Sequence, residues 1–321
     1  MKHAYFLVLP NTHVLDLAGP LQIVATLKEL GLADLDVECI GPLGAVRSFQ
    51  SPTLADLRPL PARLRPGAAL FVIGSKLDAT LTRSRPWLDA AAWLRARAAQ
   101  ADPDLQLCGV CTGTFLLAEA GLLDGRVCTT HHRFVDVLRR RHPAVHVADN
   151  RVYVRDRNVW TSAGITSGID LALHLVADAF GEDAAIQVAR ENVVHFRRFG
   201  GDPALGARLR HRSHGNARVH AVQDAISRDL TRHATCAQLA RAAGCSGRHL
   251  ARVFAAETGT TIKGFQTDLR MELARRLLAE STLSLERIAE RCGFGSVQAF
   301  RANWDQREAA PPSALRSRRK A

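Results

Sequence analysis

The hydrophobic positions of residues 1–200 alternate between two patterns along the chain. Short apolar runs that suit buried strands are separated by stretches in which apolar residues recur at helical spacing. The predicted strands cover residues 4–9, 35–40, 68–73, 105–110, 145–154 and 159–163. The predicted helices cover residues 14–30, 86–100, 112–120 and 167–180. This alternation predicts an α/β domain in which helices cover a parallel sheet.

The pattern changes near residue 200. Residues 200–216 show no clear periodicity and are rich in glycine and polar residues, which is typical of a linker. Beyond them, residues 217–307 contain a series of helical patterns and no strand pattern. We therefore expect an α/β domain over residues 1–199, a linker over 200–216 and an all-α domain over 217–321.

Charge is distributed unevenly between the two predicted domains. The chain of 321 residues has a formal net charge of +12. Residues 1–200 hold 22 Lys and Arg against 20 Asp and Glu, whereas residues 201–321 hold 21 against 11. A basic domain of this kind indicates that its partner is a polyanion such as nucleic acid. The alternative is a solvated basic surface, because part of the excess belongs to the C-terminal tail.

Composition excludes several other classes of protein. Hydrophobic residues make up 47% and charged residues 23%, which is ordinary for a folded chain. The first apolar run is too short for a signal peptide, and no later one is long enough to span a bilayer, so we expect a cytoplasmic protein without a membrane partner. The seven cysteines are scattered, and the single C-x-x-C pair, Cys108 and Cys111, lacks partners for zinc. We expect no metal and no cofactor.

Two segments of the second domain resemble each other. Residues 239–254 and 288–304 match, with one inserted residue in the second turn. The matching pairs are Leu239/Ile288, Ala240/Ala289, Gly244/Gly293, Ser246/Ser296, Leu250/Phe300 and Phe254/Trp304. The alanine lets two helices cross closely, the glycine allows a sharp turn, and the serine caps the next helix. This pattern predicts two helix-turn-helix units, whereas a single copy would also fit an ordinary helical hairpin.

Residues 217–316 resemble the AraC/XylS-type DNA-binding domain, in which a long helix joins two helix-turn-helix units. The resemblance rests on the phrases R-H-L-A-R-V-F, E-T-G-T-T, L-R-M-E-L-A-R-R-L-L and I-A-E-R-C-G-F, and it places the linking helix over residues 262–279. Glu308 and Ala309 depart from the family pattern, in which an apolar residue and glycine are usual, and Ala302 stands where arginine is frequent. We expect these departures to affect the base contacts of the second unit and not its fold.

The family's contact positions imply which side chains face DNA. They are Arg248, Ala251 and Arg252 in the first recognition helix, and Val297, Gln298 and Arg301 in the second. Arginine can bind guanine through two hydrogen bonds, glutamine pairs with adenine, and valine contacts a thymine methyl. For each arginine the alternative is a phosphate contact or plain solvation. We expect phosphate-side or structural roles for Arg241, His249, Arg270 and Arg275.

The most specific motif of the first domain is C-G-V-C-T-G-T at residues 108–114. It places Cys111 between two glycines, after a predicted strand and before a predicted helix, which is the arrangement of a nucleophile elbow. We expect the helix N-terminus to lower the pKa of Cys111 and to stabilise its thiolate. The alternative is that Cys111 is simply a small residue that fits the turn.

Residues 3–195 resemble the class I glutamine amidotransferase-like superfamily, specifically its PfpI/ThiJ-type branch, which implies a flavodoxin-like fold. The phrases V-L-D-L-A-G-P-L-Q at 14–22 and G-L-L-D-G-R-V-C-T-T-H at 121–131 support it beside the cysteine motif. The chain lacks the H-x-E motif of a glutamine amidotransferase, and Thr112 replaces the histidine of PfpI-type proteases. Isocyanide-hydratase-like enzymes pair the cysteine with an aspartate, and Asp16, Cys111 and Thr112 match their positions.

Joined in this order, the two domains resemble GlxA-like transcription regulators of the AraC/XylS family. The resemblance implies a sequence-specific DNA-binding regulator, preferentially an activator, whose ligand site consists of Asp16, Cys111, Thr112 and His131. The implied partners are promoter DNA, a small-molecule effector of the amino-acid or amine class, a second copy in a homodimer, and RNA polymerase. The alternatives are a cysteine enzyme that uses Cys111 and Asp16, and a first domain that serves mainly for dimerisation.

Overall fold

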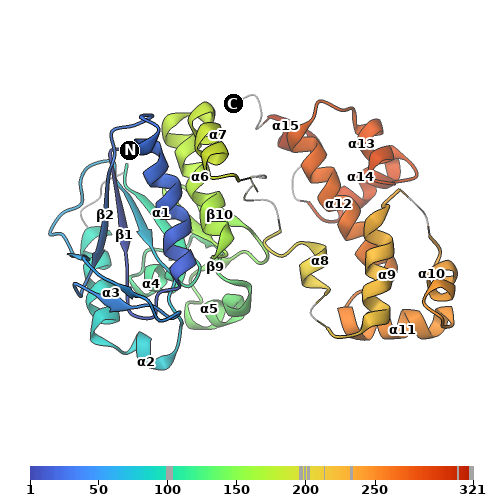
Figure 1. Ribbon diagram of the computed structural model, residues 1–321, viewed down its shortest axis with the longest axis horizontal. Coiled ribbons are helices and arrows are strands. Elements are labelled where there is room, and N and C mark those ends of the chain that lie inside the picture. Colours follow the sequence, from blue (N-terminus) through green and yellow to red (C-terminus); the bar gives the residue numbers. More distant parts are fainter. Residues whose placement is uncertain are drawn as a thin grey trace. The chain divides into compact units, whose positions relative to one another are not determined.

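The computed structural model describes residues 1–98, 104–194, 198, 200, 203–212, 214–231, 234–308 and 311–317. The chain forms two compact units, Met1–Ala204 and Leu205–Ala321. The first combines a mostly parallel sheet with helices, and the second is helical (Figure 1). The fold class expected from the hydrophobic pattern is therefore confirmed.

A mostly parallel sheet forms the centre of the first unit. Within the described residues it has seven strands in the order β10-β11-β7-β6-β1-β2-β5. They are β1 (His3–Leu7), β2 (Asp36–Gly41), β5 (Arg58–Pro59), β6 (Ala69–Val72), β7 (Gln106–Val110), β10 (Tyr153–Asp156) and β11 (Val159–Ser162). The hairpin of β10 and β11 is antiparallel and the other pairs are parallel. The carboxyl ends of β1, β6, β7 and β11 therefore share one edge of the sheet.

Helices cover both faces of this sheet (Figure 1). One face is covered by α1 (Val14–Glu29), α6 (Thr166–Phe180) and α7 (Glu182–Glu191). The opposite face is covered by α3 (Arg85–Ala98) and α4 (Gly113–Glu119). The continuous apolar runs of the central strands follow from this arrangement, because both faces of each strand are buried.

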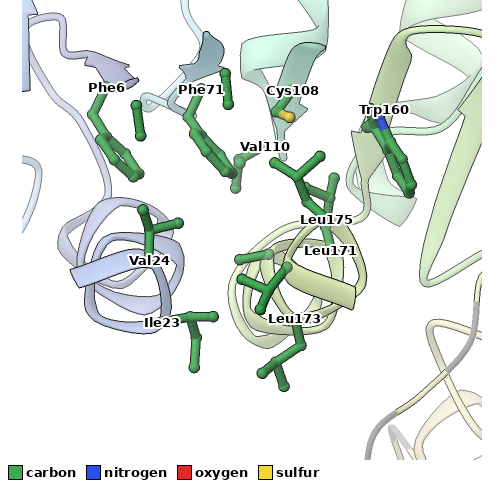
Figure 2. Packing of buried hydrophobic residues seen from close by; sticks show 14 of the residues in the cluster. Phe6, Ile23, Val24, Phe71, Cys108, Val110, Trp160, Leu171, Leu173 and Leu175 are labelled. Carbon is green, nitrogen blue, oxygen red and sulfur yellow. The ribbon is translucent and has the colours of Figure 1, made fainter. Parts of the chain in front are cut away.

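Side chains of successive strand residues point to opposite faces, so each strand contributes to two cores. Figure 2 shows the first core, where Phe6 and Phe71 point from neighbouring strands toward α1 and α6. Their rings stack at 4.6 Å between centroids. Leu7 and Val72 point instead to the second core, against α3 and α4.

Shorter elements connect the layers, and the sequence patterns did not predict them. They are the strand pairs β3 (Val46–Arg47) with β4 (Thr53–Leu54) and β8 (Val127–Cys128) with β9 (His146–Val147), the helices α2 (Ala79–Thr82) and α5 (Val135–Arg141), and the 3-10 turn η1 (His132–Phe134). The predicted strand over 145–154 was wrong, because the chain forms β9 and β10 there as separate strands. Asn150 between them has a φ of 49°, which no extended strand accommodates.

The second unit consists of short helices around one long helix. Its helices are α8 (Ala207–Arg210), α9 (Ala217–Arg228), α10 (Cys236–Ala242), α11 (Gly247–Thr258), α12 (Ile262–Glu280), α13 (Leu285–Arg291), α14 (Val297–Asp305) and α15 (Pro312–Ser317). The long helix α12 belongs to two hydrophobic cores. Phe265 and Leu269 pack with α9, α10 and α11, whereas Met271 and Leu278 pack with α13 and α14. Each core thus holds one helix pair of the predicted repeat.

The turns of the two helix pairs have the geometry that the repeat predicts. Ser246 Oγ accepts a hydrogen bond from the His249 amide, and Ser296 Oγ accepts one from the Ala299 amide. Gly244 and Gly293 have φ values of 65° and 77°. These left-handed conformations favour glycine because it has no Cβ atom. The two pairs α10–α11 and α13–α14 are therefore helix-turn-helix units.

The segment 200–216, which the sequence predicts as a linker, contains a helix of the second unit. The Ala207 amide of α8 donates a hydrogen bond to the Glu272 carboxylate of α12, and Arg210 pairs with Asp268 at 3.2 Å. In the part of the chain that the structure describes, no helix has the length and apolar character needed to cross a membrane.

Candidate functional site

Four strands of the first unit end at the same edge of the sheet and bring distant residues together. Asp16 lies in the first turn of α1 after β1, Cys111 follows β7, and glycines 74 and 164 follow β6 and β11. A Cβ atom on Gly74 would lie 2.5 Å from Asp16 Oδ2 and 2.8 Å from Cys111 Cβ. One on Gly164 would lie 2.4 Å from Cys111 Sγ. Only glycine fits at these two positions, and we call the pair that they enclose the Asp16–Cys111 site.

Cys111 lies at a sharp turn between β7 and α4. Its φ of 57° is uncommon for a residue with a side chain, and hydrogen bonds on both sides hold it there. The Cys111 amide donates to the Ser162 carbonyl at 3.0 Å, and Thr130 Oγ1 donates to the Cys111 carbonyl at 2.8 Å. The side chain is 4% exposed. The elbow therefore fixes the thiol among buried groups.

Asp16 is fully buried and accepts a short hydrogen bond from the Ile165 amide, at 2.6 Å to Oδ1. Ile165 has φ 49° and ψ −109°, and the Ser167 amide donates to the Gly164 carbonyl at 3.0 Å. These values describe a type II′ turn with Ile165 at the position where glycine is usual. A β-branched residue in this conformation costs about 1–3 kcal/mol. The Asp16 carboxyl stabilises the turn from which α6 begins.

Burial and mutual interaction set the protonation of the Asp16–Cys111 site. Burial raises the pKa of Asp16, although the Ile165 amide and the Cys111 thiol partly oppose this. Burial also raises the pKa of Cys111 well above its ordinary value, and the neighbouring Asp16 carboxylate adds to that effect. The expected lowering of the Cys111 pKa by the helix N-terminus was therefore wrong. Desolvation outweighs the N–H groups of the short helix α4, so Cys111 is a thiol at neutral pH.

Thr112 is buried and its side chain is already engaged within the protein. Its hydroxyl donates to the Ser75 carbonyl at 2.6 Å and accepts from the Ser75 amide at 2.9 Å. It thereby ties the turn after β6 to the turn after β7. Thr112 lies directly beside the Asp16–Cys111 site, and its contacts with Ser75 fix the backbone there.

Histidines stand near this edge of the sheet. Burial, with smaller contributions from the cations around it, lowers the pKa of His131 to about 4. The ring of His131 lies 4.2 Å from that of His132 between centroids. His13 interacts electrostatically with both Asp16 and His131. Within the described residues, no three His, Cys, Asp or Glu side chains are grouped to hold a metal ion.

Sequence reasoning missed His13, which lies three residues before Asp16. Its Nδ1 atom is 3.1 Å from Gln50 Nε2, and its ring meets that of Phe49 edge-on at 5.0 Å. Gln50 Oε1 in turn accepts a hydrogen bond from the Val14 amide at 3.0 Å. Residues 49 and 50 come from a loop with no motif, so the sequence offers no signal that they lie beside α1.

The recognition helices of the second unit are α11 and α14. Arg248, Ala251 and Arg252 are exposed on α11, and Gln298 and Arg301 are exposed on α14. Val297 is half-buried against the second hydrophobic core. In the part of the chain that the structure describes, the side chains of Arg248, Arg252 and Arg301 make no ion pair or hydrogen bond. Their guanidinium groups are therefore available to an external partner.

Two other arginines considered from the sequence have internal contacts. Arg270 is 8% exposed, and its Nε donates to the Leu230 carbonyl at 2.9 Å. Arg275 forms an ion pair with Glu308 at 2.5 Å, and both side chains are mostly buried. The unusual Glu308 is thus paired within the domain, and Ala309 lies outside the described residues. Arg241 and His249 lie at the surface of the first helix-turn-helix unit.

Comparison with known families supports both resemblances. Residues 85–178 match the DJ-1/PfpI family, and residues 239–318 match a helix-turn-helix domain family. The chain is 33% identical over 206 residues to the HTH-type transcriptional regulator CdhR of Pseudomonas aeruginosa, covering 64% of this chain and 61% of that protein. It is 32% identical over 228 residues to the HTH-type transcriptional regulator GlxA of Rhizobium meliloti, covering 67% and 66%. The match thus spans less than two thirds of these regulators' length.

An enzyme and solved structures also match. The chain is 34% identical over 182 residues to the isonitrile hydratase of Pseudomonas putida, covering 56% of this chain and 73% of the enzyme. A crystal structure of an AraC family transcriptional regulator from Pseudomonas putida matches with a TM-score of 0.50 and 20% identity, covering 60% of this chain and 100% of that one. A putative transcriptional regulator from Vibrio parahaemolyticus matches with a TM-score of 0.51 and 18% identity, covering 59% and 98%. These two structures share the fold.

Proposed function

Because the chain belongs to the AraC/XylS family, with a DJ-1/PfpI domain before its helix-turn-helix domain, we propose that it is a sequence-specific DNA-binding transcription regulator. The observation that carries the proposal is the pair of helix-turn-helix units on one shared helix, each with exposed, unpaired arginine on its second helix. Such helices enter the major groove, where arginine binds guanine.

The contact residues in the proposal are Arg248, Ala251 and Arg252 on α11, and Val297, Gln298 and Arg301 on α14. Val297 packs on the second core, so in the proposal it reaches DNA through part of its surface. The basic excess of residues 201–321 supports the same partner, because phosphate neutralisation releases counterions from DNA. The proposal further includes a homodimer, activation through RNA polymerase, and a cytoplasmic location.

In the proposal the first unit senses a small molecule of the amino-acid or amine class. The ligand site consists of Asp16, Cys111, Thr112 and His131, which lie at or near the carboxyl edge of the sheet, where ligands of open α/β sheets bind. Among described N–H and O–H groups, none donates to Asp16 Oδ2. Because Oδ2 is buried beside the Cys111 thiol, the proposal requires the site to open before an ammonium or amide group of a ligand can bind it. Binding that favours one arrangement of the chain would shift promoter occupancy.

DNA selection tests the proposal because it identifies a binding site from random sequence. The full chain is incubated with a random duplex library, and bound sequences are enriched over several rounds. We expect a bipartite motif whose two halves are about 34 Å apart, one helical turn, because each recognition helix reads one major-groove face. Enrichment without any common sequence would contradict sequence-specific regulation.

A second candidate function is hydration by a Cys111 nucleophile with Asp16 as acid or base. The similarity to isonitrile hydratase and the adjacency of the two side chains favour it. The raised pKa of Cys111 counts against it, because the thiol is a weaker nucleophile than the thiolate. Incubation of the full chain with an isonitrile, with its consumption measured over time, tests this second function. Consumption that is lost in Cys111→Ser would establish the enzyme, and no consumption would reject hydration of isonitriles.

A further inference from the structure

Arg198 is fixed to the first two turns of α6 by four hydrogen bonds. Its amide donates to Asp170 Oδ1 at 2.9 Å, and its Nε and Nη2 donate to Asp170 Oδ2 at 2.9 and 2.6 Å. Nη2 also donates to Thr166 Oγ1 at 2.9 Å. Asp170 is 5% exposed, so this ion pair is shielded from solvent on one side. Arg198 itself is thereby held against the helix.

The same turn of α6 is held from its other end by the Asp16–Cys111 site. The helix begins at Thr166, directly after Ile165, whose amide donates to Asp16 Oδ1 at 2.6 Å. Asp16 in turn interacts with the Cys111 thiol. Of the two partners of Arg198, Thr166 directly follows Ile165, and Asp170 lies about one helical turn further along.

Arg198 lies close in sequence to the start of the second unit. Arg198 lies seven residues before Leu205, where the second unit begins. Hydrogen bonds to charged groups are stronger than those between neutral groups and depend steeply on geometry. Asp16 contacts the residue before α6, and Arg198 contacts Thr166 and Asp170 within the helix, so both bind the same short segment.

We propose that the start of α6 with the residue before it, residues 165–170, is a coupling element that links the state of the Asp16–Cys111 site to Arg198, seven residues before the second unit begins. Asp16 acts at one end of the turn and Arg198 at the other. The inference rests on the proposed function, because it assigns the route by which an effector signal would leave the first unit. Coupling is reciprocal, so a change at either end must be felt at the other.

Amide-resolved hydrogen exchange on the full chain, without DNA or effector, tests this coupling. The reporters are the Arg198 amide, which donates to Asp170, and the Ile165 amide, which donates to Asp16. In Asp16→Ala we expect exchange of the Arg198 amide to rise by about tenfold or more, the effect of losing one hydrogen bond to a charged group. Asp16→Asn keeps an acceptor for Ile165 and should give a smaller rise.

The reciprocal variant is Arg198→Ala, which alters a partly exposed side chain and leaves the buried site intact. We expect exchange of the Ile165 amide to rise by about tenfold, as coupling requires. Arg155→Ala is the matched control, because Arg155 makes a two-fold ion pair with Asp178 near the far end of α6. Arg155→Ala should leave the exchange rate of the Ile165 amide unchanged.

Two outcomes would overturn the coupling. One is an Ile165 amide that exchanges at its wild-type rate in Arg198→Ala, which would make the Arg198 contacts purely local. The other is a rise in exchange of the Ile165 amide that is as large in Arg155→Ala as in Arg198→Ala, which would mean that any loosening of α6 has the same effect. Neither outcome bears on DNA recognition, which the library selection measures independently, so the two proposals fail separately.

Discussion

Only some of the individual residues of the site could be predicted from the sequence. The motif around Cys111 predicted the first central side chain from its place between a strand and a helix, whereas Asp16 was implied only by the resemblance to isocyanide-hydratase-like enzymes. His13, Gln50 and Ile165 were missed, since their roles arise from loops that meet only in the folded sheet. The pKa of Cys111 was predicted in the wrong direction, because burial cannot be read from a local motif.

The turn at Ile165 gives a prediction about backbone strain. Replacing Ile165 with glycine should leave the protein about 1 kcal/mol more stable than replacing it with alanine, because only glycine adopts the observed φ without strain. Differential scanning calorimetry of the full chain measures the difference. The matched control is Ile186, an exposed residue of α7, where alanine should be the more stable replacement. Equal stability of the two Ile165 variants would contradict the strain.

His131 gives a prediction about pH. Its pKa of about 4 in the folded protein lies below the value of 6.5 for a free side chain, so the unfolded chain takes up the proton first. Stability should therefore fall as pH decreases from about 6.5 to 4. His131→Gln should reduce this dependence, whereas replacement of the exposed His146 should not. Urea unfolding at several pH values measures the free energy of unfolding. If its dependence on pH were the same in His131→Gln as in wild type, the prediction would be contradicted.

At the scale of elements, long regular segments were predicted well and short ones were not. Helix α1 lies within a residue of its predicted range, because its apolar pattern extends over several turns, and α12 lies within a residue of the range that the family resemblance implied. The two-residue strands and α5 carry too few residues to show a period. The turns of the helix-turn-helix units were predicted because glycine and serine have specific backbone roles there.

The two turn glycines differ in their surroundings, which gives a matched prediction. Both have positive φ, but a Cβ on Gly293 would lie 2.2 Å from the Leu230 carbonyl oxygen, whereas one on Gly244 meets nothing within 4 Å. Gly244→Ala should cost about 1–2 kcal/mol from conformation alone. Gly293→Ala should cost about 1–3 kcal/mol more, because the backbone must move. Thermal unfolding of the second unit's helices, followed by circular dichroism, measures both losses of stability. An equal loss in the two variants would contradict the predicted difference.

At the scale of the whole molecule, the order of the two units and their charges carried the functional argument. A nearly neutral α/β unit precedes a basic helical unit, and the family matches fall one on each. The sequence could predict this organisation because composition and repeats are visible along the chain itself and do not depend on tertiary contacts. It could not predict the route from Asp16 to Arg198, which depends on residues far apart in the chain.

The central claim is that exposed arginines of the recognition helices read DNA sequence. The most direct measurement compares the affinity of the full chain for its selected site and for random duplex, in wild type and in Arg248→Ala/Arg252→Ala. Each lost bidentate contact costs about 1–3 kcal/mol, so discrimination should fall by at least about tenfold. Arg63→Ala/Arg65→Ala, which removes the same charge from an exposed loop of the first unit, should discriminate as wild type does. Wild-type discrimination in the α11 variant would contradict the account.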